Sequence, residues 1–449
     1  MRSKQFVALL VIAAVIGVLV SVAVWCFLEL IYQLQQELFT HLPHAVGYEH
    51  GPPLWWSLPV LGVGALLAAL AITRLPGDGG HLPARGLSTG GPMPSIDLPG
   101  VILAALASIG FGLVIGPEAP LIAIGSGLAV LTISLARREM PPQMLVVIGA
   151  TGSFAAVAFL FDSPLIAAVL LIEAAGLGGA RRNLVVLPGL LGAGIGTLVS
   201  IGMGSFTGLS SSAYAIGALE LPKFGHPDIA QFGWTIALAI AVAVIARVIM
   251  IGGLGTHGVV VRRMLLLLPL VGLIIAGLAI AFHGASGKSV NEVLFDGQSA
   301  LPGLVSQAGT WSLGALALLI VFKGLAYGLS LGSFRGGPTF PAMFLGAAGG
   351  IMASHLPGFP LTPAVAVGIG AAIAAVLRLP LSAIVLATLL TANAGTGDEP
   401  LIIVGVVVAY LVSLFFVQLP TANGSDADRA TAASQAAPER GAPAPTTAH

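Results

Sequence analysis

Charged residues are scarce in this sequence: Asp, Glu, Lys and Arg make up only 8% of its 449 residues. A soluble domain carries about 25% of them, so the chain has too little charge to cover itself with a water-facing surface. Hydrophobic residues reach 57%, with a mean hydropathy of +1.01. These numbers exclude a soluble protein and predict an integral membrane protein.

The near absence of cysteine and the absence of a basic excess narrow the class of protein further. The single cysteine, Cys26, excludes an intramolecular disulfide. The 18 basic and 18 acidic residues balance, so there is no basic excess to attract a nucleic acid. We expect no nucleic-acid partner, no cofactor, no metal and no enzymatic activity.

Long apolar segments are what the chain has instead. The first runs without charge from Gln5 to Leu28, which is longer than the apolar core of a signal peptide, about 7–15 residues. It is long enough to cross a hydrocarbon layer of about 30 Å. Arg2 and Lys4 precede it and favour a cytoplasmic N-terminus. We therefore expect a multi-pass protein of the plasma (inner) membrane.

Several later segments are short or interrupted by proline. The apolar segments span 6–28, 54–73, 99–135, 143–177, 184–203, 230–256, 264–282, 311–331, 339–353, 364–392 and 400–418. Interruptions such as "GP", "SP" and "LP" indicate broken or re-entrant helices, which a membrane tolerates only where the freed backbone is buried in protein or lines a cavity. The composition changes after Pro420, and residues 421–449 are expected to be a disordered tail.

Two motifs occur twice in the same order. "IGPEAPLIAIG" (115–125) and "GGPTFPAMFLG" (336–346) share the pattern G-P-x-x-P-x-x-x-x-G, 221 residues apart. "AAVAFLFDSPL" (155–165) is similarly followed by "AAVLRLPL" (374–381). The repetition predicts a duplicated architecture with halves of 1–225 and 226–420. Transporters built from two such halves place their sites where the interrupted helices meet.

Each copy of the G-P motif reads as a helix that begins inside the membrane, because proline suits the first turn of a helix. The free N–H groups and the dipole of such a helix form a positive pole without a full charge. Two poles that face each other would hold a dehydrated anion mainly by backbone groups. Partial charges also let the anion leave, so the pattern favours an anion over a cation.

Glu118 is the only charged residue between Asp97 and Arg137. A carboxylate at this helix start could occupy the place of the anion, and its protonation would open the path. Ionisable residues inside a membrane are usually functional. The alternative is a structural carboxylate bonded to nearby backbone N–H groups.

Four motifs resemble the CLC family of chloride channels and proton-coupled chloride transporters. "GPEAP" (116–120) resembles the family's G-[KR]-E-G-P, and "KGLAYGLSLGSFRGGPTFPAMFLGAAGG" (323–350) resembles the segment that ends in G-x-F-x-P. "SPLIAAVLLIEAA" (163–175) and "GDGGHLPARG" (77–86) resemble two further family segments, the latter G-S-G-I-P. The resemblance implies an all-α polytopic fold with two inverted-topology repeats and broken helices, assembled as a homodimer with one anion pathway per subunit.

The resemblance also implies site residues. Glu118 aligns with the gating glutamate, and Glu173 is a second candidate for handling protons, with the capping of a neighbouring helix as its alternative role. The implied anion-binding residues are Gly79, Gly80, His81, Gly116, Ala119, Gly337, Thr339 and Phe340. For His81 the alternative is a loop histidine bonded to backbone.

The sequence also departs from the family pattern. Gly80 stands at the anion-binding serine, so a hydroxyl is missing, and Thr339 stands at the phenylalanine of G-x-F-x-P. Pro117 and Pro338 lack the backbone N–H groups that often bind the anion. Ala174 replaces the inner glutamate of many proton-coupled members. Beyond residues 400–418 no further apolar segment carries the family's tyrosine, for which Tyr410 is a weak substitute.

We therefore expect transport of chloride or another small inorganic anion, as proton-coupled exchange gated by Glu118, with protons and membrane lipid as further partners. A passive CLC-type anion channel is the alternative within the family. An intramembrane enzyme or a non-transporting scaffold is the alternative from another class.

Overall fold

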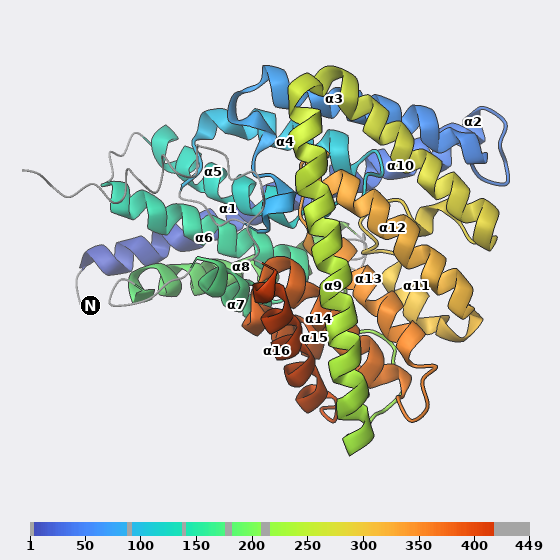
Figure 1. Cartoon of the computed structure of the whole chain (residues 1–449). Coiled ribbons are helices and arrows are strands. Elements are labelled where there is room, and N and C mark those ends of the chain that lie inside the picture. The colour runs from blue at the N-terminus through green and yellow to red at the C-terminus, as the bar shows by residue number, and fades with distance from the viewer. Residues whose placement is uncertain (1–3, 88–91, 137–140, 176–181, 208–215, 417–449) are drawn as a thin grey trace, which may run out of the picture.

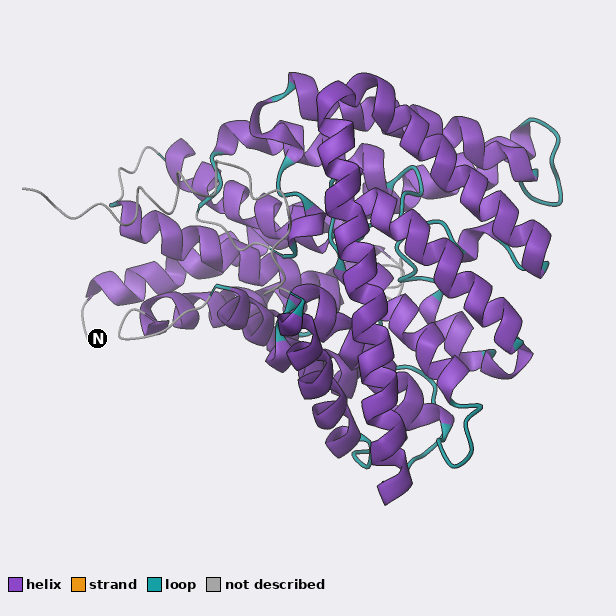
Figure 2. Cartoon of the chain, viewed as in Figure 1, coloured by secondary structure: helices purple, strands orange, loops and turns teal. Residues whose placement is uncertain are grey.

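A computed structural model of the chain describes residues 4–87, 92–136, 141–175, 182–207 and 216–416. These residues form helices and loops without a β-strand (Figure 2). Seven helical stretches among them are long and apolar enough to cross a membrane. The predicted tail, 421–449, lies outside the described residues.

The helices follow the predicted apolar segments closely. In chain order they are α1 (Lys4–Gln36), α2 (Leu42–Ala45), α3 (Ser57–Arg74), α4 (Leu98–Ile109), α5 (Glu118–Leu135), α6 (Pro142–Phe161), α7 (Pro164–Ala174), α8 (Arg182–Thr207), α9 (Ile229–Val260), α10 (Met264–Ser286), α11 (Leu301–Ser306), α12 (Leu313–Ser333), α13 (Thr339–Ala353), α14 (Leu361–Leu377), α15 (Pro380–Leu390) and α16 (Glu399–Phe415). Figure 1 shows α5, α6 and α8 on one side of the long helix α9, and α11 to α13 on the other.

The predicted breaks within the membrane segments are confirmed. Segment 99–135 divides into α4 and α5, segment 143–177 into α6 and α7, and segment 364–392 into α14 and α15. Two of these breaks have the same construction. Asp162 and Arg378 end α6 and α14 in the left-handed conformation, with φ of 48° and 58°. Pro164 and Pro380 then begin the next helices, where proline costs no hydrogen bond.

A close helix crossing between two glycines occurs twice, once between α5 and α6 and once between α13 and α14. A Cβ added to Gly125 of α5 would lie 2.5 Å from the carbonyl oxygen of Gly152 in α6. Gly346 of α13 and Gly368 of α14 meet in the same way, each backbone occupying the space that a Cβ on the other would need. Small residues let membrane helices approach backbone to backbone. The division into halves 1–225 and 226–420 stays a prediction, which these matched crossings and corners favour.

We predict that Gly368→Ala destabilises the protein by about 1–3 kcal/mol, because the added methyl group would overpack the crossing of α13 and α14. Thermal unfolding in detergent measures the effect as a lower Tm. Gly277→Ala is the matched control, since no atom lies within 4 Å of a Cβ at that position of α10. Equal Tm values for the two variants would contradict the packing argument.

Candidate functional site

The N-termini of α5 and α13 meet head to head in the protein interior. Just before them, the N–H of Gly116 donates to the carbonyl of Gly337 at 2.8 Å, and the N–H of Gly337 donates to the carbonyl of Gly116 at 2.5 Å. Pro117 and Pro338 follow these glycines and cap the two helices. The two copies of the G-P motif therefore form one junction, as the sequence predicts for facing helix poles.

Glu118, the first residue of α5, is 1% exposed at this junction. The backbone N–H of Thr339, the first residue of α13, donates to its Oε1. Oε2 of Glu118 has no hydrogen-bond partner among the described residues. The carboxylate of one broken helix thus occupies the positive pole of the other.

The two glycines of the junction make room for this carboxylate. A Cβ on Gly116 would overlap Oε2 of Glu118, and a Cβ on Gly337 would overlap its carboxyl carbon. The glycine requirement of the motif is therefore steric at this point, because any larger residue would expel the carboxylate from the junction.

Few N–H groups remain for an anion. Pro120 and Pro341 stand at the third position of α5 and α13 and have no N–H. The N–H groups of Gly116 and Gly337 are used by their mutual bonds. Of the residues predicted to bind an anion at the junction, this leaves Ala119, Thr339 and Phe340, and Thr339 already donates to Glu118. Ala119 and Phe340 have N–H groups that no helical carbonyl can reach.

Tyr327 of α12 is a functional candidate that the sequence reasoning missed. It is 1% exposed, and its hydroxyl donates to the carbonyl of Pro338 at 2.5 Å. Phe340 is held in turn by stacking on Phe161, with ring centroids 5.5 Å apart. The chain has only five tyrosines, and one inside an apolar segment ten residues before Gly337 of the second G-P motif was the available signal.

An acidic region lies beside Glu118. Asp296 is the charged group whose field reaches Glu118, and it borders a small cleft of about 60 Å³ together with Pro117, Gln298 and Ser299. Loss of water around the Asp296 carboxyl raises its pKa to about 6. The cleft thus places a carboxyl group and further polar side chains beside Pro117, directly before the start of α5.

Lys323 of α12 is fully buried next to this region. Its ammonium group donates to the carbonyls of four consecutive residues, 292 to 295, at 2.9 to 3.4 Å, and lies 4.4 Å from the ring centroid of Phe344. The lysine therefore fixes the segment that carries Asp296.

Gly79, Gly80 and His81 lie at a different place, against Arg335. Both glycines have positive φ, 71° and 95°, and a Cβ on Gly79 would lie 3.1 Å from Cγ of Arg335. A ring nitrogen of His81, Nε2, lies 3.0 Å from the carbonyl of Gly86, which is the alternative that the sequence left open. Burial lowers the pKa of His81, and the charges of Arg85 and Arg335 lower it further against the effect of the Gly86 bond.

Glu173 caps the start of α15. Its Oε1 accepts from the N–H of Leu381 at 2.9 Å, and its Oε2 accepts from the N–H and the hydroxyl of Ser382 at 2.8 and 2.6 Å. This is the contact that its alternative role predicts. A role in proton handling stays a prediction.

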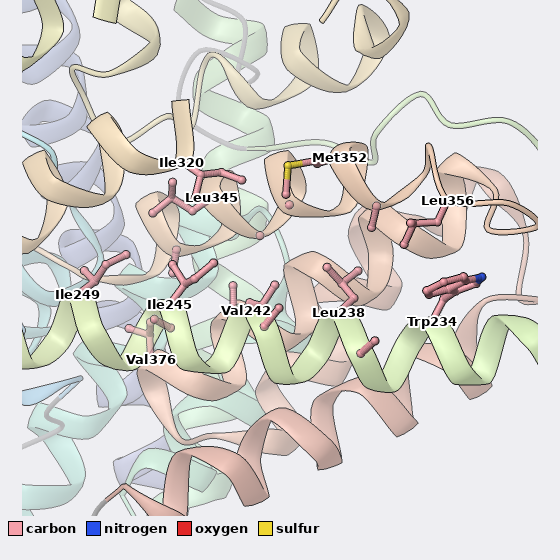
Figure 3. Close-up of a pocket in the computed structure, with 18 of the residues that line it drawn as sticks. Trp234, Leu238, Val242, Ile245, Ile249, Ile320, Leu345, Met352, Leu356 and Val376 are labelled. Carbon is pink, nitrogen blue, oxygen red and sulfur yellow. The ribbon is translucent and has the colours of Figure 1, made fainter. Parts of the chain in front are cut away.

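A cavity of about 420 Å³ lies between α9, α12 and α13 (Figure 3). Its labelled lining residues are Trp234, Leu238, Val242, Ile245, Ile249, Ile320, Leu345, Met352, Leu356 and Val376. These lining side chains are almost all apolar and offer almost no hydrogen-bond donors. A bare anion in the cavity would therefore be left without partners. The helix junction, with its backbone N–H groups, therefore suits an anion better than this cavity does.

The fold and the junction define a class: multi-pass membrane proteins whose broken helices meet N-terminus to N-terminus inside the bilayer. The sequence model of the family "Voltage gated chloride channel" matches residues 64–414. The chain belongs to this family, the CLC family, so the resemblance seen in its motifs is confirmed. Its members are transporters and not enzymes, and the chain is accordingly an integral membrane protein of CLC anion-transporter type.

Known proteins resemble the chain over most of its length. YfeO of Escherichia coli O1:K1 / APEC, whose name assigns it provisionally to ion transport, is 27% identical over 363 residues, which cover 78% of this chain and 80% of YfeO. The crystal structure of a slow cyanobacterial Cl⁻/H⁺ antiporter matches with a TM-score of 0.72 and 20% identity, over 94% of this chain and 96% of that one. The crystal structure of a CLC-type fluoride/proton antiporter matches with a TM-score of 0.65 and 18% identity. This match covers 92% of this chain and 97% of that one. These structures share the fold.

We predict that Glu173→Ala lowers the free energy of unfolding by about 1–3 kcal/mol, because the start of α15 loses an acceptor for three hydrogen bonds. Thermal unfolding measures the loss, and the exposed Glu220 supplies the control variant Glu220→Ala. A Glu173→Ala protein as stable as the control would show that the cap contributes little.

Proposed function

We propose that this protein exchanges a small inorganic anion, chloride in the first instance, for protons, and that Glu118 is the gate. The observation that carries the proposal is the bond from the N–H of Thr339 to the buried Glu118 carboxylate. A negative group already sits at the positive pole where an anion would bind.

Competition between the two negative groups gives the mechanism. While Glu118 is ionised, its carboxylate fills the pole of α13 and closes the path. Protonation removes its charge and weakens its hold on the Thr339 N–H, because charge-assisted hydrogen bonds are roughly twice as strong as neutral ones. An anion then takes the N–H groups of Thr339 and Phe340 while Glu118 carries the proton.

The acidic region supports a proton route from one side. Asp296 and its polar cleft adjoin Pro117, directly before Glu118. For the other half of the proton route we propose Glu173 as the proton-carrying acid. Its carboxylate is hydrogen-bonded to the N-terminus of α15, so it can accept a proton only by releasing these hydrogen bonds. Both solved structures named above are proton-coupled antiporters by their titles, which favours exchange over a passive channel.

We further infer a homodimer with its N-terminus in the cytoplasm and its place in the plasma (inner) membrane. The family resemblance supports the dimer. The basic residues Arg2 and Lys4 before the first span support the orientation.

The test is anion flux with simultaneous pH recording in liposomes that contain the purified protein. A chloride gradient should drive protons in the opposite sense across wild-type membranes. Glu118→Gln should reduce this proton movement at least about tenfold, because glutamine cannot carry the proton and a 1.4 kcal/mol change already corresponds to tenfold. Glu49→Gln, at an exposed loop position, should leave coupling intact.

Each alternative gives a different result. Fast chloride flux without proton movement in the wild type would identify a passive channel and contradict exchange. A wild-type protein without anion flux would contradict transport altogether and favour an enzyme or a scaffold.

A further inference from the structure

The junction is built symmetrically except for its charges. The hydroxyl of Ser108, in α4, accepts from the N–H of Arg335 at 3.4 Å, and the hydroxyl of Ser330, in α12, accepts from the N–H of Val114 at 3.2 Å. Val114 and Arg335 are 221 residues apart, the spacing of the two G-P motifs. They therefore hold equivalent places in the two copies, and only the second copy has a base there.

Arg335 is a buried cation without an acidic partner. It is 5% exposed, and no carboxylate of the described residues forms an ion pair with it. Nε donates to the carbonyl of Asp78 at 3.0 Å, and Nη1 donates to the carbonyl of Phe334 at 3.3 Å. Nη2 has no acceptor among the described residues. Burying an unpaired charge is costly, so this edge of the guanidinium invites a negative ligand.

The surroundings of Arg335 are basic. His81 and Arg85 come from the loop before α4, and His257 comes from α9, where its Nδ1 lies 3.1 Å from the carbonyl of Gly332. Arg85 and Arg335 both act electrostatically on each of the two histidines. Asp78 is the acid whose field reaches Arg335.

The polypeptide that follows the two glycines does not begin a long helix as Gly116 and Gly337 do. The residues after Gly79 and Gly80 form only one 3₁₀ turn, Pro83–Arg85, and a macrodipole needs a longer run of aligned peptides. The glycine at position 80 offers no hydroxyl either. The Arg335 side chain is a buried positive charge beside Gly79.

We propose that Arg335 coordinates the transported anion at a second site, formed with Gly79, Gly80 and His81. This inference rests on the proposed anion transport and adds a residue that determines affinity and selectivity. The ligand is a small monovalent anion, and the flat donor edge of a guanidinium suits a planar oxyanion such as nitrate at least as well as a halide. Because two of its nitrogens already donate to carbonyls, only one edge is offered, which leaves the anion free to depart.

The test compares Arg335→Gln, Arg335→Lys and Arg262→Gln in liposomes, with chloride and nitrate as the transported anions. Arg262 is an exposed arginine of the turn between α9 and α10, so its variant removes the same charge outside the site. Initial rates against anion concentration give a KM for each anion. We expect Arg335→Gln to raise both KM values by about tenfold or more, the size of a lost charge-assisted hydrogen bond, and Arg262→Gln to change neither by more than about twofold.

Arg335→Lys keeps the charge as a point donor and loses the flat edge. It should keep a chloride KM within about threefold of wild type while its preference for nitrate over chloride falls. If Arg335→Gln does not fold, as judged by size-exclusion chromatography, Arg335→Lys alone tests whether Arg335 binds the anion. Unchanged KM values in Arg335→Gln, or an unchanged nitrate preference in a folded Arg335→Lys, would overturn the proposal.

Failure of the proposed function would look different, because wild-type liposomes would then show no anion flux. Thermal unfolding with increasing sodium nitrate still tests Arg335 in that case, since a bound anion raises Tm. The wild type and Arg262→Gln should be stabilised by nitrate and Arg335→Gln should not. An equal rise in all three would contradict an anion site at Arg335.

Discussion

The paired backbone hydrogen bonds between Gly116 and Gly337 are the contact on which the rest of the structure depends. They bring the starts of α5 and α13 together, so the free N–H groups of two helices point into one buried place. Each helix must therefore begin inside the protein, and prolines are accommodated there because the first N–H groups have no helical acceptor. The carboxylate of Glu118 can reach the N–H of Thr339 only because both glycines lack side chains.

Duplication explains the geometry of this junction, and the exceptions to duplication explain its chemistry. Equivalent corners, crossings and serine contacts recur between the two copies. The acid at Glu118 is matched by Thr339, whereas the base at Arg335 is matched by Val114. The two copies of the junction segment thus differ by one acid in the first copy and one base in the second. In our proposal the acid closes the path to the anion and the base binds the anion at a second point.

Much of this arrangement follows from the sequence, because glycine and proline fix local backbone geometry. The breaks at 110–117, 162–164 and 378–380 and the pairing of the two G-P motifs could be predicted in this way. Arg335 and Tyr327 could not, since one is a loop residue and the other a residue of an apolar helix whose partners come from distant segments. The sequence also could not decide between the two roles of Glu173, because its contact with α15 joins residues 208 and 209 positions away.

The central claim is that the Glu118 carboxylate and the transported anion compete for the N–H groups at the start of α13. Bromide anomalous scattering from crystals of the wild type and of Glu118→Gln, grown under the same conditions, tests it most directly. The account predicts a bromide peak within hydrogen-bond distance of the N–H groups of Thr339 and Phe340 in the variant, and no peak there in the wild type while Glu118 is ionised. A bromide at that place in the wild type with the carboxylate still bonded to Thr339, or none in either protein, would contradict it.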